Sequence, residues 1–227
     1  MLTQVAGVLL AAGEGARFGQ PKALIELDGM TLAERGVALL RTGGADPVLV
    51  VTGAAPELGP GLVGVHTVYN PAWRTGMGSS LRVALTALGA PGADGAALEG
   101  VGAAVIALAD QPLIGAAAVR RLIDAYRAGA SVAVAAYAGK PRNPVLIARE
   151  HWADVIASAT GDTGARGFLR AQQDLVTLVE CGDTGSPDDV DTPADLARIV
   201  RNIHPDARLS RAGSGCGRLT RRGGYRS

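Results

Sequence analysis

The sequence predicts an α/β fold, built as a three-layer sandwich around a mostly parallel sheet. The first observation is alternation, because apolar runs of strand length, such as 5–10 and 103–108, are followed by segments with helical spacing. The second is that these runs are apolar throughout, as is typical of strands covered by helices on both faces. The third is length, since 227 residues suffice for one domain with its own core.

Four strands and two helices are predicted in the first half of the chain. Each strand is a short, largely apolar run, and glycine, asparagine or aspartate follows closely. The first helix ends at Gly43 and Gly44, and the second places Leu81, Leu85 and Leu88 on one face. In chain order we expect strand 5–10, helix 32–40, strands 47–51 and 63–68, helix 79–88, a Gly/Ala-rich loop over 89–102, and strand 103–108.

The second half alternates in the same way and ends in a polar tail. The last helix is marked by Pro193 in its first turn, where the missing N–H costs no hydrogen bond. We expect helix 116–126, strands 131–136 and 145–148, helix 152–159, a short helix at 165–172, strand 175–180 and helix 193–203. Apolar periodicity stops after this helix, which predicts a domain over 1–204 and a flexible, Arg/Gly-rich tail over 205–227.

Composition excludes several classes of protein. The net charge is +1, but residues 207–227 hold six arginines and no acid, so the remaining residues carry −5. An acidic body argues against nucleic acid as a partner. Cys181 and Cys216 are too far apart to indicate a disulfide framework or zinc site, and Cys181 is expected to be buried. The apolar run at 5–12 is too short to span a membrane, so we expect a cytoplasmic protein without a membrane partner.

The most informative segment is the glycine-rich stretch over 10–22 (LAAGEGARFGQPK), which directly follows the first predicted strand. Ligands of α/β proteins bind at this end of the strands. Glycines allow the backbone to approach an anion closely and to point N–H donors at it. Arg17 and Lys22 add positive charge. This segment therefore predicts a phosphate-binding loop.

Two common phosphate-binding motifs do not fit this loop. Its glycines, at 13, 15 and 19, are spaced one residue wider than the dinucleotide fingerprint, and Val51-Thr52 ends the second strand without the acid that would bind a ribose. A P-loop is excluded because Pro21 precedes Lys22. The chain has 20 arginines and only two lysines, which favours a lysine-specific role for Lys22 over an incidental charge.

The loop, together with four further motifs, resembles the nucleotidyltransferases of the MobA-like NTP-transferase family, and most closely the molybdenum cofactor cytidylyltransferases. The further motifs occur in the order typical of that family: 70–81 (NPAWRTGMGSSL), 108–112 (LADQP), 161–166 (GDTGAR) and 189–196 (DVDTPADL). The resemblance implies a Rossmann-like nucleotidyltransferase fold. It also implies transfer of CMP from CTP to the phosphate of molybdenum cofactor, with release of pyrophosphate.

Two aspartates are the candidate metal ligands. Asp110 follows strand 103–108 at the rim of the sheet, and a carboxylate facing a triphosphate suits Mg²⁺, with Mn²⁺ as an alternative. The resemblance implies Asp191 as the second ligand, and Asp189 is the alternative. Thr192 is placed to cap the last helix, which leaves Asp191 free.

The resemblance also implies roles for individual residues. Lys22, Arg17 and Asp110 are expected to be catalytic, with Arg17 on the departing phosphates and Lys22 on the α-phosphate. Arg166 and Asn143 are expected near the acceptor, although the family has Gly-His-Pro-Val where this chain has 142–145 (RNPV). Capping of a helix is the alternative role for Arg166. The start of helix 79–88 offers free N–H groups for a base edge or a phosphate, and capping of this helix by Ser79 is compatible with that role. The nucleotide-binding set is Leu10, Ala11, Ala12, Gly13, Glu14, Gly15, Arg17, Lys22, Ser79, Ser80 and Asp110.

Alternatives to the cytidylyltransferase remain open. One is a nucleotidyltransferase of the same fold that uses GTP or a sugar or polyol phosphate. Another is a non-catalytic protein that delivers molybdenum cofactor. A transient contact with a molybdoenzyme is expected for delivery and for the cytidylyltransferase alike. The pair Lys22 and Asp110 favours turnover, because a carrier would not need both. Ala12 favours CTP over GTP, since related GTP-using enzymes have glycine at this place in the loop.

Overall fold

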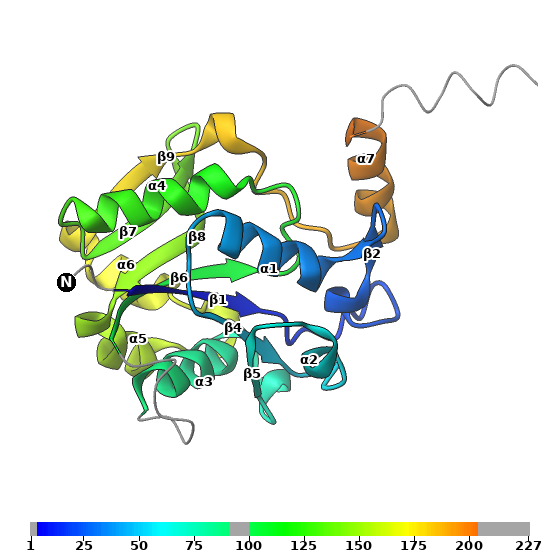
Figure 1. Cartoon of the computed structure of the whole chain (residues 1–227), viewed down its shortest axis with the longest axis horizontal. Coiled ribbons are helices and arrows are strands. Elements are labelled where there is room, and N and C mark those ends of the chain that lie inside the picture. Colours follow the sequence, from blue (N-terminus) through cyan, green and yellow to red (C-terminus); the bar gives the residue numbers. More distant parts are fainter. Residues whose placement is uncertain (1–3, 91–99, 204–227) are drawn as a thin grey trace, which may run out of the picture.

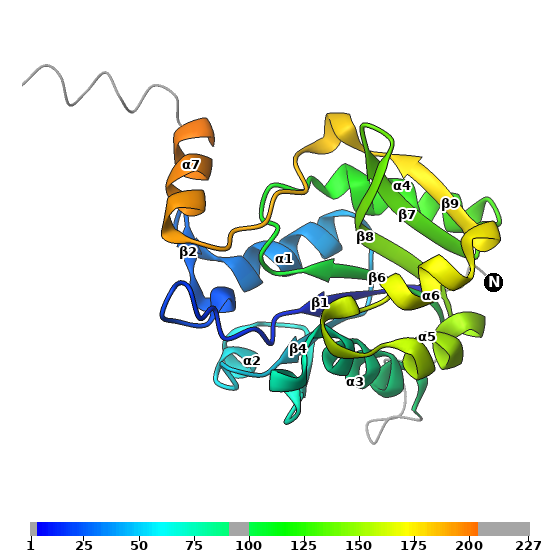
Figure 2. The same ribbon diagram turned by 180° about the vertical axis from the view of Figure 1, so that it is seen from behind.

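A computed structural model describes residues 4–90 and 100–203, and within them the central element is a seven-stranded sheet (Figures 1 and 2). Its spatial order is β5–β4–β1–β6–β8–β7–β9, and β8 alone runs antiparallel to its neighbours. This confirms the predicted mostly parallel sheet. The strands are β1 (Gln4–Leu10), β4 (Val48–Thr52), β5 (His66–Tyr69), β6 (Val101–Leu108), β7 (Val132–Tyr137), β8 (Lys140–Ala148) and β9 (Val176–Glu180).

Helices cover both faces of the sheet, which confirms the three-layer architecture (Figure 1). One face packs against α1 (Leu32–Thr42) and α4 (Ala116–Arg127). The other packs against α3 (Met77–Gly89), α5 (Trp152–Ser158) and α6 (Arg166–Ala171). Two further helices are α2 (Leu58–Gly61) and α7 (Pro193–Ile203), and α7 lies to one side of the sheet beside β2. No helix in the two described ranges is long and apolar enough to cross a lipid bilayer.

The central strands β1 and β6 fix where the site lies. Apart from the exposed Gln4 at the start of β1, both strands are apolar and almost fully buried, as strands covered on both faces require. They pair in parallel, and the register places Leu10 opposite Leu108 at their carboxyl ends. The glycine-rich loop and Asp110 therefore leave the sheet side by side, at the edge where α/β proteins bind ligands.

Several details differ from the predicted elements. The third strand begins at His66 rather than at residue 63, and α3 begins at Met77, two residues earlier than predicted. Strand β8 is longer than predicted because it begins at Lys140, and its exposed residues Lys140 and Pro141 pair with the end of β7. The hairpin of β2 (Glu26–Leu27) and β3 (Met30–Thr31), and α2, were not predicted. The predicted tail, 205–227, and Cys216 lie outside the described residues, as do residues 91–99 of the predicted loop.

Candidate active site

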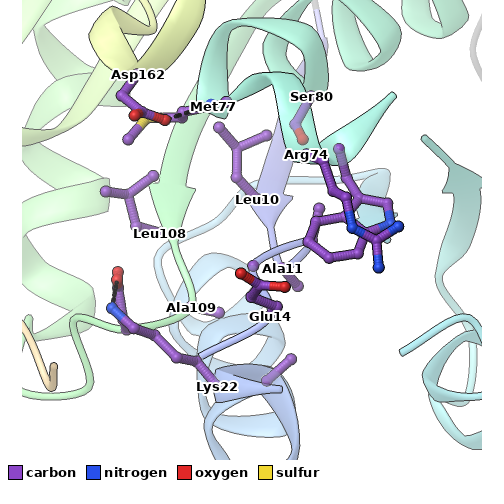
Figure 3. A pocket seen from close by; sticks show the side chains of 16 residues that line it. Leu10, Ala11, Glu14, Lys22, Arg74, Met77, Ser80, Leu108, Ala109 and Asp162 are labelled. Carbon is purple, nitrogen blue, oxygen red and sulfur yellow. Dashed lines mark hydrogen bonds and ion pairs between the residues drawn. The ribbon is translucent and has the colours of Figure 1, made fainter. Parts of the chain in front are cut away.

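A pocket of about 450 Å³ opens at the carboxyl ends of β1 and β6 (Figure 3). One wall consists of the loop residues 11–14 and the side chain of Lys22. Another consists of the start of α3 and Asp162. Of the predicted nucleotide-binding residues, Leu10, Ala11, Ala12, Gly13, Glu14, Lys22, Ser80 and Asp110 line this pocket. Arg17, Gly15 and Ser79 do not line it.

The glycine-rich loop is folded around Gly15. The amides of Phe18 and Gly19 donate to the Gly15 carbonyl at 2.7 and 3.1 Å, and Gly15 has a φ of 63°. A Cβ at this position would lie 2.1 Å from the carbonyl oxygen of Gln20, so only glycine closes the turn. Within the described residues, the amides of 12–16 donate to no other protein group. Unpaired amides beside a pocket are the feature that an anion-binding loop requires.

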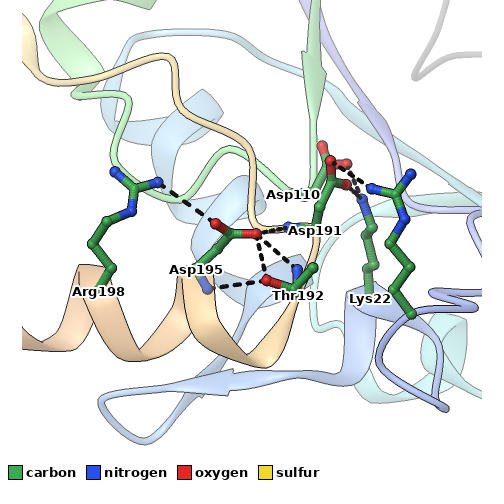
Figure 4. Close-up of polar contacts among 7 residues, drawn as sticks. Lys22, Asp110, Asp191, Thr192, Asp195 and Arg198 are labelled. Atoms are coloured by element: carbon green, nitrogen blue, oxygen red, sulfur yellow. Dashed lines mark hydrogen bonds and ion pairs between the residues drawn. The ribbon is translucent and has the colours of Figure 1, made fainter.

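Lys22 joins the loop to both candidate metal ligands (Figure 4). Its Nζ donates to Asp110 Oδ2 at 2.8 Å and to Asp191 Oδ1 at 2.5 Å. Burial lowers the pKa of Lys22, but the charges of Asp110 and Asp191 and their hydrogen bonds outweigh it, so the pKa lies above its usual value. Arg17 approaches the other oxygen of Asp191 at 3.4 Å, with its side chain 72% exposed. Three residues far apart in sequence thus meet at one point.

Asp191 is held in place by main-chain and helix-cap contacts. The amide of Val190 donates to the Asp110 carbonyl at 2.8 Å, so the chain before α7 crosses the end of β6. Thr192 and Asp195 form a reciprocal cap at the start of α7, since each side chain accepts from the other's amide, at 2.9 and 3.2 Å (Figure 4). Thr192 is therefore the cap, as predicted, and Asp191 remains available at the site.

A small hydrophobic core, separate from the two that cover the sheet, packs beside the site. It joins residues next to the loop, in the β2–β3 hairpin and at the start of α1 with residues on both sides of Asp191. Its apolar contacts fix the loop against the segment that carries Asp191. The buried members are Ile25, Leu27, Leu32, Val190 and Ile199, and Phe18 packs against them.

Within the described residues, no group of three or more histidine, cysteine or acidic side chains is placed to hold a metal ion. Asp110 and Asp191 nevertheless fit a divalent cation, because both already bind one positive charge, the ammonium of Lys22. Mg²⁺ takes only one or two carboxylates and completes its shell with water and substrate phosphates. Asp189 instead accepts from Gln111 Nε2 at 2.9 Å, and desolvation and the Asp110 charge raise the pKa of its carboxyl.

The opposite wall is built around the start of α3. Asn70 is buried and its Nδ2 donates to the hydroxyls of Ser79 and Ser80 at 2.8 and 3.0 Å. The Ser79 hydroxyl also donates to the Gly76 carbonyl at 2.8 Å, so it belongs to the helix start. Gly76, not Ser79, is the N-cap of α3. The Ser80 oxygen faces the pocket.

The two expected acceptor residues lie outside the pocket lining. Asn143 is half-buried in β8, and because β8 is antiparallel its first residues lie at the same edge as the carboxyl ends of β6 and β7. Arg166 is exposed as the first residue of α6. It follows Asp162 by one turn of chain, and Asp162 lines the pocket and accepts from the Met77 amide at 3.4 Å. The structure does not bring Asn143 and Arg166 into the Lys22 cluster.

Several pocket residues were not predicted to bind ligand, and three of them, Trp73, Arg74 and Asp162, carry polar or aromatic side chains. Asp162 lies in the motif over 161–166, which offered a signal. Trp73 lies in the motif over 70–81, and its side chain is half-buried at the pocket. Arg74 gave no signal in sequence, because its placement depends on its contact with the Trp73 ring.

Comparison with known proteins shows the family. Residues 7–176 match the family model of the MobA-like NTP transferase domain. Nicotine blue oxidoreductase of Paenarthrobacter nicotinovorans is 35% identical over 207 residues, which are 86% of this chain and 96% of that protein. A molybdenum cofactor guanylyltransferase of Xanthomonas euvesicatoria pv. vesicatoria is 46% identical, but over 65 residues, which are 29% of this chain and 33% of that protein.

Solved structures agree with the fold. Rv0371c from Mycobacterium tuberculosis H37Rv superposes with a TM-score of 0.73 at 27% identity, covering 88% of this chain and 100% of that one. A complex of Rv0371c with manganese has a TM-score of 0.69, also at 27% identity, over 88% and 99% of the two chains. With the family model matched over most of the domain, the predicted fold and family are confirmed: the chain belongs to the MobA-like NTP transferases.

Proposed function

We propose that this protein transfers CMP from CTP to the phosphate of molybdenum cofactor and releases pyrophosphate. The observation that carries the proposal is the meeting of Lys22, Asp110 and Asp191 beside a loop of unpaired amides. Cations and backbone amides stabilise the negative charge on a transferred phosphoryl group, and a pair of carboxylates can bind a metal ion that does the same. No nucleophilic side chain is required, because an acceptor phosphate is ionised at neutral pH.

Each group has a defined part in the reaction. A phosphate oxygen of the acceptor attacks the α-phosphorus in line as the bond to the bridging oxygen breaks, and pyrophosphate leaves with the electron pair. The loop amides over 12–15 bind the triphosphate, and Arg17 binds the departing β- and γ-phosphates. The ammonium of Lys22 lies between two carboxylates beside the pocket, where it can bind the α-phosphate and stabilise the charge that develops on it.

Asp110 and Asp191 are the proposed ligands of a divalent cation, Mg²⁺ or Mn²⁺. Such an ion would neutralise charge on the phosphates when bound. Manganese in a structure of Rv0371c supports a divalent cation in this fold. Both carboxylates are partly exposed, at 24% and 42%, and so are open to a cation arriving with the nucleotide.

The choice of CTP depends on Ala12. Its methyl lines the pocket and also packs against Gly53, where a Cβ would lie 2.7 Å from that of Ala12. The Ala12 methyl takes up room that a larger base would use, and Gly53 prevents this methyl from moving out of the pocket. GTP is the competing nucleotide. It is supported by relatives that are similar over a short stretch of the chain and are named guanylyltransferases.

The acceptor is proposed from the same relatives, whose names include molybdenum cofactor. Asn143 lies at the carboxyl edge of the sheet, and Arg166 begins the helix that follows the pocket residue Asp162. Both lie outside the nucleotide pocket, and we assign the acceptor to the surface that they border. A transient contact with a molybdoenzyme would follow from delivery of the product.

An oxidoreductase is the second candidate, because a relative similar over most of the chain carries that name. Hydride transfer from a nicotinamide dinucleotide would call for a ribose-binding acid near the end of the second parallel strand. In this chain β4 ends in the buried Thr52. The site therefore favours a nucleoside triphosphate over a dinucleotide.

One experiment separates these functions. The purified protein is incubated with molybdenum cofactor, Mg²⁺ or Mn²⁺ and each of CTP, GTP and ATP, and pyrophosphate release is followed. Pyrophosphate formed with CTP supports the cytidylyltransferase, and preferential use of GTP supports the guanylyltransferase. Cofactor binding without pyrophosphate indicates a delivery protein. Oxidation of NADH or NADPH with an electron-accepting pigment, in place of pyrophosphate release, indicates the oxidoreductase.

A further inference from the structure

The charge balance of the pocket draws attention to Arg74. Among the residues that line the pocket, the cations are Lys22 and Arg74. Lys22 is already paired with Asp110 and Asp191. Arg74 has no carboxylate within 4.0 Å in the described part of the chain, while Glu14 and Asp162 add negative charge to the lining. A polyanionic substrate would therefore meet only one uncompensated cation in this lining.

Arg74 is also held in a defined orientation. Its guanidinium carbon lies 4.2 Å from the centroid of the Trp73 ring. Stacking on an aromatic face leaves the N–H donors in the guanidinium plane free to bind a planar or tetrahedral anion. Trp73 is itself fixed, because its amide donates to the Asn70 carbonyl at 3.3 Å and its Cβ packs closely on Gly53. Figure 3 shows Arg74 on the opposite side of the pocket from Lys22.

We propose that Arg74, stacked on Trp73, binds a phosphate group of the substrates across the pocket from Lys22. The proposal rests on the proposed nucleotidyl transfer, which brings two sources of phosphate to this pocket, the triphosphate of the nucleotide and the phosphate of the acceptor. Arginine is suited to either, since its fork of donors binds phosphate in a bidentate manner.

The test uses Arg74→Met, which keeps an unbranched stem over Trp73 without charge, and Arg74→Lys, which keeps charge without the planar fork. Arg127→Met, at the exposed end of α4, is the matched control for net charge. Dissociation constants are measured by calorimetry for CTP, inorganic tripolyphosphate and cytidine, and KM is measured for the acceptor.

If Arg74 binds the nucleotide, Arg74→Met weakens CTP and tripolyphosphate by about tenfold, the scale of a hydrogen bond to a charged group, and leaves cytidine unchanged. If Arg74 binds the acceptor, CTP and tripolyphosphate are unchanged and the acceptor KM rises by a similar factor. In either case Arg74→Lys is intermediate and Arg127→Met resembles the parent.

The proposal is overturned if Arg74→Met binds CTP and tripolyphosphate with the affinity of the parent and, in addition, either the acceptor KM is unchanged or no transfer occurs. An equal loss for cytidine would show that Arg74 only supports the pocket wall. Failure of the proposed function is seen separately, as absence of transfer by the parent protein, because the affinity for tripolyphosphate is measured without an acceptor.

Discussion

Replacing Lys22 by methionine removes the cation that joins the loop to Asp110 and Asp191 and keeps the length of the side chain. The ammonium lies 2.8 and 2.5 Å from the two carboxylates, and its side chain is 20% exposed. At such distances one unit-charge interaction is worth about 1.5–6 kcal/mol for an effective dielectric constant between about 80 and 20. If Lys22 makes a similar contact with the α-phosphate in the transition state, we expect kcat to fall by at least about a hundredfold, which is about 2.7 kcal/mol.

The assay is pyrophosphate release at saturating nucleotide and divalent cation, with the melting temperature recorded in parallel. Lys140→Met is the matched control, because Lys140 is the only other lysine of the chain and is exposed at the start of β8. Folding should survive the Lys22 change, since its carboxylate partners are partly exposed and screened. Parental turnover in Lys22→Met would refute the role given to this residue, whereas a large loss of melting temperature would make its role structural.

Three further predictions concern selectivity, pH and the tail. Ala12→Gly should narrow the preference for CTP over GTP in kcat/KM without abolishing it, because one methyl contributes about 1–3 kcal/mol; an unchanged ratio would exclude the steric argument. Burial raises the pKa of Tyr137 to about 12. The unfolded phenol ionises near pH 10, so folding stability should fall between about pH 10 and 12, by up to about 2.7 kcal/mol, and urea titrations of Tyr137→Phe should lack this part of the loss. Deleting residues 207–227 should leave the melting temperature and turnover nearly unchanged, since this segment has little apolar sequence; a marked drop in either would show that it binds the body or the substrates.

The central strands could be predicted because a short run of apolar residues indicates a strand that is buried on both faces. Apart from Gln4, strands β1 and β6 are apolar, and the loops that follow parallel strands of this type lie at one edge of the sheet. The approach of Lys22 to Asp110 follows from that arrangement. Burial of Cys181, which is fully inaccessible, was likewise predictable from its type.

Other features depend on contacts between distant segments. Asp191 reaches Lys22 only because Val190 packs in the small core and bonds to the Asp110 carbonyl, and local sequence does not contain that information. The strands β2 and β3 have two residues each, too few for any periodic pattern. Ser79 and Ser80 are both fixed by the buried Asn70, whose Nδ2 donates to the two hydroxyls. Arg74 became a candidate only through its contact with Trp73.

Transfer of a nucleotidyl group moves the α-phosphate of the nucleotide to the acceptor, so the fate of this phosphate distinguishes transfer from hydrolysis. CTP labelled at the α-phosphorus is incubated with the parent protein, molybdenum cofactor and Mg²⁺ or Mn²⁺, and the products are separated. We expect label on the acceptor in a one-to-one ratio with pyrophosphate, and loss of both on removal of the divalent cation. Label that stays in CTP, or that appears only as free CMP whatever the acceptor, would contradict nucleotidyl transfer.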